Sequence, residues 1–86
     1  MASNMTGGSK TIAATYAQLS TSTAGVRNMH IRNFDGNSRV MLGDADGNDV
    51  GFLNGGEGLT LQHIRPCDVY VKGTAADVIF WLGDRA

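Results

Sequence analysis

The sequence has a single cysteine, Cys67, and a single proline, Pro66, among its 86 residues. One cysteine excludes an intrachain disulfide. A chain of this length forms one domain whose own core supplies only about 3–5 kcal/mol of net stability. Domains of this size often gain further stability from disulfides, a metal or other subunits. Since a disulfide is excluded, neighbouring subunits or a metal are left as additional supports.

Charge is scarce and balanced, with seven Lys plus Arg against eight Asp plus Glu and a formal net charge of −1. The basic residues are scattered along the chain, whereas nucleic-acid binders carry a basic excess or a basic cluster. No apolar run approaches the roughly 20 residues of a membrane helix. The first ten residues also lack the apolar stretch of a secretory signal. We therefore expect neither nucleic acid nor a membrane as the primary partner.

Strand signals dominate the sequence from Val26 onwards. Short apolar alternations are interrupted at regular spacing by Gly, Asn and Asp, which is typical of a sandwich or barrel. In the segment 29–33, for example, Met29, Ile31 and Asn33 share one strand face. The pattern predicts an all-β protein, a small antiparallel β-sandwich or barrel of jelly-roll-like form with six to eight short strands. Residues 12–86 form its single domain.

The first eleven residues, 1–11, are polar and contain Gly7 and Gly8. This composition gives no core to fold around and predicts a flexible N-terminal arm that becomes ordered against a partner. The segment from Ile12 to Leu19 is the best candidate for a helix. Its threonine-rich surroundings favour an extended chain instead.

The last strand, Val78 to Leu82, is apolar on both strand faces. A strand covered on one side should alternate, so both faces of this strand are expected to be covered. Either a neighbouring subunit or the N-terminal arm covers the second face, and the sequence favours neither. We expect an interface with a partner subunit, and the residues assigned to it are Ser9, Lys10, Thr11, Ile79 and Trp81.

One acidic loop is a weak candidate for a calcium site. Residues Asp44 to Asn48 match the first five positions of an EF-hand loop. The sixth position requires Gly but is Asp49, and the twelfth requires Glu but is Gly55. A solvated hairpin loop explains the segment better. An irregular site using Asp44, Asp46 and Asp49 stays open as a minor alternative.

No other group of residues predicts catalysis. His63 and Cys67 lack an orienting third group and an oxyanion site, and adding His30 gives no zinc-ligand spacing. The glycine-rich segment Asn54 to Gly58 lacks the Lys of a phosphate loop, and Glu57 is its only carboxylate. The sequence also lacks the metal-ligand motif that an enzyme of cupin-like shape would require. We expect a protein that is not an enzyme and has no cofactor and no resident metal.

Three motifs between Val26 and Leu82 carry a resemblance to a known class of proteins. They are the strand Met29-His30-Ile31-Arg32-Asn33, the turn Gly55-Gly56-Glu57-Gly58-Leu59-Thr60-Leu61, and the closing segment Val69-Tyr70-Val71-Lys72-Gly73-Thr74-Ala75-Ala76-Asp77-Val78. Together they make about two-thirds of the chain similar to small β-sandwich proteins of tailed-bacteriophage particles. These motifs encode turns and strands and identify no active site.

The resemblance implies a structural virion protein, with capsid decoration or cement as the leading role. It implies the major capsid protein or other virion proteins as partners, a homotrimer, and a place on the capsid surface after assembly in the host cytoplasm. The alternative is a small carbohydrate- or receptor-binding module of a tail or fibre appendage. In that case Tyr16, Tyr70 and Trp81 would stack on sugars.

Overall fold

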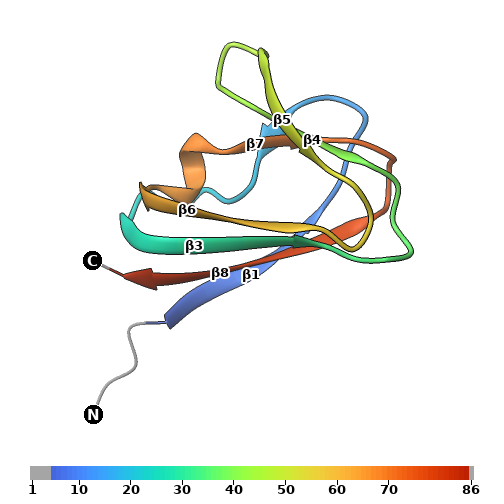
Figure 1. Cartoon of the computed structure of the whole chain (residues 1–86). Coiled ribbons are helices and arrows are strands. Elements are labelled where there is room, and N and C mark those ends of the chain that lie inside the picture. The colour runs from blue at the N-terminus through green and yellow to red at the C-terminus, as the bar shows by residue number, and fades with distance from the viewer. Residues whose placement is uncertain (1–4, 86) are drawn as a thin grey trace.

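The computed structural model describes residues 5–85, which form two four-stranded antiparallel sheets packed as layers (Figure 1). Sheet A has the order β1-β8-β3-β6, and sheet B has the order β2-β7-β4-β5. This confirms the predicted all-β sandwich. The elements are β1 (Met5–Thr11), β2 (Ala17–Gln18), β3 (Val26–Asn33), β4 (Val40–Gly43), β5 (Asp49–Leu53), β6 (Gly58–Ile64), the short 3₁₀ helix η1 (Pro66–Asp68), β7 (Tyr70–Lys72) and β8 (Val78–Arg85).

The strand order is that of a jelly roll, in which eight strands form two facing sheets. Among the described strands, only β4 and β5 are consecutive in the chain and adjacent in one sheet. Every other connection crosses from one sheet to the other. This order places the first strand beside the last, so β1 pairs with β8 from Met5 opposite Asp84 to Thr11 opposite Val78.

The N-terminal segment differs from the flexible arm expected over residues 1–11. Residues 5–11 form the edge strand β1, and residues 1–4 lie outside the described residues. Of the two glycines that suggested flexibility, Gly7 is the one that the close approach of β1 to β8 requires. A Cβ at Gly7 would lie 2.6 Å from the carbonyl oxygen of Trp81, and one at Gly8 would lie 3.5 Å from Trp81 Nε1. The sandwich therefore extends beyond residues 12–86 and includes β1.

Strand alternation builds the core between the two sheets. Met29 and Ile31 of β3 are buried on the face that the sequence predicted, and Val40 and Leu42 of β4 face them from sheet B. The apolar core residues are Ile12, Leu19, Val26, Met29, Ile31, Val40, Leu42, Leu53, Val69, Val71, Ile79 and Trp81. Their burial on folding is the main force that holds the layers together.

A buried asparagine connects the two layers. The Asn33 side chain is 0% exposed at the end of β3. Its Nδ2 donates hydrogen bonds to the carbonyl oxygens of Ser38 and Leu53, both at 3.0 Å. Its Oδ1 accepts a 3.0 Å bond from Nδ2 of Asn37, which also donates to the carbonyl of Val78 at 2.8 Å. This network ties sheet A to β5 of sheet B.

Candidate functional site

The last strand presents one apolar face to the core and the other to solvent. Ile79 and Trp81 are buried inside the sandwich, whereas Phe80 and Leu82 are 45% and 49% exposed on the outer face of sheet A. This corrects the interface assigned from the sequence, because Ile79 and Trp81 belong to the chain's own core. The side chain of Trp81 points inward because it lies directly opposite the buried Ile31 of β3.

The other three residues expected at an interface lie on the edge strand β1. Ser9 and Thr11 are exposed and lie opposite Phe80 and Val78 of β8. Lys10 is half-buried, and it lies opposite Ile79 on the side of the strand that faces the core. Ser9 and Thr11 thus adjoin the apolar outer face of β8, and the role of all three residues at an interface stays a prediction.

Four exposed apolar side chains form a continuous outer stripe, which we define as Met5, Phe34, Phe80 and Leu82. The rings of Phe34 and Phe80 are 5.0 Å apart between centroids and tilted by 46°. Leu82 and Met5 line the same shallow hollow on this face. Because Phe80 and Leu82 are two residues apart on one strand, the stripe runs along β8 from one end of sheet A to the other.

Polar side chains border the outer stripe. His30 Nδ1 and Thr60 Oγ1 are 3.2 Å apart on the neighbouring strands β3 and β6. Arg27 forms an ion pair with Asp84, with 3.2 Å between Nη2 and Oδ2. An apolar centre with a polar rim is the usual composition of a protein interface.

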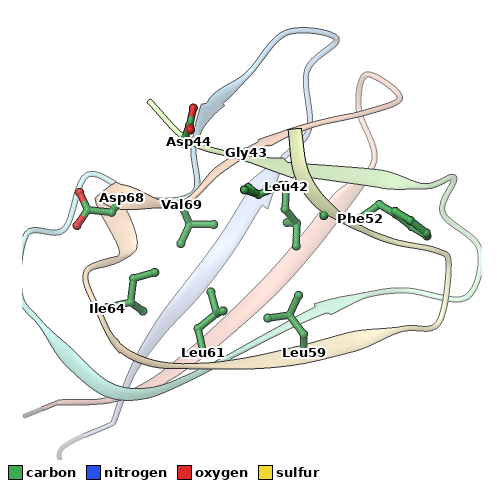
Figure 2. Close-up of a pocket in the computed structure, with 11 residues that line it drawn as sticks. Leu42, Gly43, Asp44, Phe52, Leu59, Leu61, Ile64, Asp68 and Val69 are labelled. Carbon is green, nitrogen blue, oxygen red and sulfur yellow. The ribbon is translucent and has the colours of Figure 1, made fainter. Parts of the chain in front are cut away.

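A second apolar feature is a cavity of about 370 Å³ between β5 and β6, each of which lies at one edge of its sheet (Figure 2). We call it the edge cavity. Leu59 and Leu61 of β6 point into it from sheet A, and Leu42 points towards them from sheet B. On β5 at its rim, Val50 is 73% exposed and Phe52 is 48% exposed. The apolar interior of the sandwich is therefore open along this side.

The chain matches no family model, no curated protein and no solved structure. The two apolar surfaces above are thus characterised by their own geometry. Among the described residues there is no helix long and apolar enough to cross a membrane.

A polar cluster on sheet B brings together Tyr16, which directly precedes β2, with Asp49 of β5 and Lys72 of β7. The Tyr16 hydroxyl donates to the carboxylate of Asp49, and Lys72 Nζ lies 3.7 Å from Asp49 Oδ1. Lys72 Nζ also lies 4.6 Å from the centre of the Tyr16 ring. Partial burial, followed by the hydrogen bond and the negative charge of Asp49, raises the pKa of Tyr16 to about 12. Tyr16 is therefore a neutral hydrogen-bond donor at neutral pH.

The three aromatic residues expected to stack on sugars do not form one exposed platform. Trp81 is in the core, and Tyr16 and Tyr70 are half-buried. Trp81 is therefore unavailable to a sugar. The exposed aromatic residues are phenylalanines, namely Phe34, Phe52 and Phe80.

The acidic loop adopts a hairpin turn. Asp44 Oδ1 accepts hydrogen bonds from the backbone N–H groups of Asp46 and Asn48, both at 3.0 Å. The hydrogen bonds from Asn48, backbone first, hold the pKa of Asp44 below its usual value. Asp49 is directed instead to Tyr16 and Lys72. Nowhere in residues 5–85 do three or more His, Cys, Asp or Glu side chains form a group that could hold a metal ion.

The remaining candidates from the sequence have structural roles. His63 is exposed and has a positive φ of 53° near the end of β6, and the register of β6 against β3 continues past it to Ile64 opposite Val26. Cys67 is buried within η1, and its backbone N–H donates to the carbonyl of Ser22. Glu57 closes the turn before β6 because its Oε1 accepts a 2.7 Å bond from the backbone N–H of Asn54.

Proposed function

We propose that this chain is a non-enzymatic structural protein that is built into a larger assembly. Capsid decoration or cement on a tailed-phage head is the role that the motif resemblance favours. The observation that carries the proposal is the outer stripe, which leaves Phe80 and Leu82 about half exposed on the outer face of sheet A. Contiguous exposed apolar surface with a polar rim marks a site of protein contact.

The size of the outer stripe indicates how it would bind. Its four side chains are between 43% and 61% exposed, which corresponds to roughly 350–400 Å² of apolar area. Covering that area would contribute about 9–10 kcal/mol at 25 cal/mol per Å². Association costs about 4–15 kcal/mol, so one stripe alone gives weak binding. Several copies acting together on a repetitive surface would bind far more tightly, which supports a trimeric cement.

The fold is compatible with this role. Jelly rolls occur in viral capsid and lectin domains as well as in cupins, so the fold by itself does not choose a function. The rival carbohydrate-binding role depended on an aromatic platform that included Trp81, and Trp81 is 6% exposed in the core. The exposed apolar surface therefore favours contact with protein over contact with sugar.

The direct test uses phage particles of the genome that encodes this chain. We expect quantitative mass spectrometry to find the chain at a fixed copy number per particle, and antibodies to label the head surface. If the chain is found neither on assembling particles nor on purified particles, the proposal is wrong.

A matched pair of variants tests the surface itself. Particles made without the chain are incubated with purified protein, and bound protein is quantified. The double change Phe80→Ser and Leu82→Ser should weaken attachment at least about tenfold, because two of the four side chains of the stripe are lost. Met41→Ser, on the outer face of sheet B, should attach as the unaltered protein does. Equal attachment of both variants, with circular dichroism showing both folded, would refute the role of the stripe.

A further inference from the structure

The edge cavity is a place where the chain leaves its own core unfilled. Its lining is apolar and comes from both sheets, with Leu42 and Val69 on one side and Leu59, Leu61 and Ile64 on the other (Figure 2). A dry cavity of about 150 Å³ accommodates a benzene molecule. At about 370 Å³, the edge cavity has room for roughly two large apolar side chains.

Gly51 keeps this cavity open. It lies in the middle of β5, directly opposite Leu42, so a side chain at position 51 would point into the cavity as that of Leu42 does. A Cβ at Gly51 would meet no atom within 4 Å, and its φ is outside the left-handed region. The chain itself thus imposes no need for glycine here. A glycine inside a strand weakens it and often marks the close approach of another backbone or a ligand.

The strands on either side of the cavity indicate what kind of ligand fits. In the described chain, β5 and β6 are the last strands of their sheets, so each pairs with a neighbour on one side only. An extended polypeptide laid along either edge can form backbone hydrogen bonds and send every second side chain into the cavity. A small apolar molecule could fill the cavity but would leave both edges unpaired.

The lining also indicates the chemistry of that polypeptide. Asp44 and Asp68 are the charged groups among the described residues that line the cavity, and both are acidic. Asp68 is already ion-paired with Arg65, with 2.9 Å between Nε and Oδ2, so the charge left for a ligand is mainly that of Asp44. A flanking basic residue is therefore favoured over an acidic one. The chain's own edge strand β1 is a poor occupant, because Met5 is its only large apolar residue.

We propose that the edge cavity binds an extended segment of a partner protein, with apolar residues at alternate positions and a basic residue at the end near Asp44 and Asp68. Pairing with β5 or β6 supplies the backbone contacts, and the alternate side chains complete the core above Gly51. This inference rests on the proposed function in one respect, namely that the partner is another component of the same assembly.

The test uses a synthetic ten-residue peptide as the probe. It has two lysines at one end, followed by Val, Leu and Phe alternating with Thr. The control peptide has proline in place of the central Thr, which removes a backbone donor and prevents pairing. Titration of isotope-labelled protein should shift the amide resonances of β5 and β6, and the proline peptide should bind at least about tenfold more weakly.

Matched variants connect binding to the cavity. Gly51→Val should reduce affinity for the alternating peptide at least about tenfold and raise the thermal midpoint, because the new side chain fills the cavity. Gly25→Val is the control, since a Cβ at Gly25 also meets no atom within 4 Å and lies outside the cavity. Should Gly51→Val fold poorly, Gly51→Ala should give a smaller loss of binding.

Three results would overturn the inference. They are equal binding of the two peptides, unchanged binding by both Gly51 variants, and shifts of the lining residues with benzene but not with peptide. The last result would identify a site for small apolar molecules. Peptide binding by a chain that is absent from particles would refute the proposed function alone. A chain present on particles that binds no peptide would refute the edge-cavity inference alone.

Discussion

The buried network of Asn33 allows a quantitative prediction about stability. The change Asn33→Leu keeps a side chain of similar size but removes three hydrogen bonds. The carbonyl of Leu53 loses a buried partner, which costs about 1–3 kcal/mol. The bonds with Ser38 and Asn37 are only partly buried, so water can replace part of them at about 0.5–1 kcal/mol each. We expect a loss of about 2–5 kcal/mol in the free energy of unfolding.

Such a loss is large for a domain of this size. For 60–100 residues, each kcal/mol lowers the thermal midpoint by about 4–8 °C, so a loss near 3 kcal/mol lowers it by roughly 12–24 °C. The net stability of so small a core is itself only about 3–5 kcal/mol. Asn33→Leu should therefore leave the isolated chain at the margin of folding.

The change Asn33→Asp adds a dependence on pH. A carboxyl group at this position is buried and faces two carbonyl oxygens, so its pKa in the folded state rises above the unfolded value of about 3.9. Folding then favours the protonated form. The variant should be least destabilised below about pH 4 and should lose further stability as the pH rises through the folded-state pKa. Asn33→Leu should show no such pH-dependent increment.

Urea unfolding followed by fluorescence measures these effects, because Trp81 is the only tryptophan and lies in the core. Asn28→Leu on the exposed side of β3 is the control and should change stability by less than about 0.5 kcal/mol. The reasoning is refuted if Asn33→Leu is as stable as this control. It is also refuted if the Asn33→Asp penalty is the same at pH 4 and pH 7.

Two further predictions concern the first strand and the sheet B cluster. Gly7→Ala should detach β1 and increase amide hydrogen exchange along β8, because its Cβ would lie 2.6 Å from a backbone oxygen; Gly8→Ala should not, since its nearest contact is 3.5 Å. Absorbance titration should find Tyr16 ionising near pH 12, and Asp49→Asn should lower that pKa. The pKa of Tyr16 is about 12 in the folded state and about 10 in the unfolded state. The neutral hydroxyl therefore contributes its full stabilisation below about pH 10, and this contribution is lost as the pH rises towards 12. An unchanged pKa in Asp49→Asn would contradict the assigned hydrogen bond.

The strand faces of the central sheets could be predicted from the sequence. Met29 and Ile31 alternate with polar residues, and so does the pair Val69 and Val71, so a period of two assigns each to the buried side. The turn residues between the strands predicted six to eight strands, and residues 5–85 of the structure form eight. These are local signals, and the structure confirms them.

The first and last strands could not be assigned in the same way. Strand β1 is a polar edge strand whose place depends on a distant partner, β8, and no local pattern reports such pairing. In β8 both strand faces are apolar, so alternation does not distinguish them. The pairing of β8 with β3 determines which face is buried, because the buried Ile31 lies opposite Trp81 and the indole therefore lies in the core.

The edge cavity also depends on the order of strands. Leu59 and Leu61 have the inward pattern of core residues, and only the position of β6 at the edge of sheet A leaves them partly uncovered. In the sequence Gly51 lies two residues after a cluster of turn residues that runs from Gly43 to Asp49. Its role emerges only when β5 is aligned with β4 and position 51 falls opposite Leu42.

The two apolar surfaces lie on different sides of the same sheet. The outer stripe follows β8 on the face of sheet A that is directed away from sheet B, whereas the edge cavity lies between the sheets, beside β6. Strand β3 separates β8 from β6, so a segment bound in the edge cavity would leave Phe80 and Leu82 accessible. One copy could then contact two neighbours at once. If both proposals hold, two weak contacts on one rigid domain would reinforce each other, because the second contact forms at a high effective concentration.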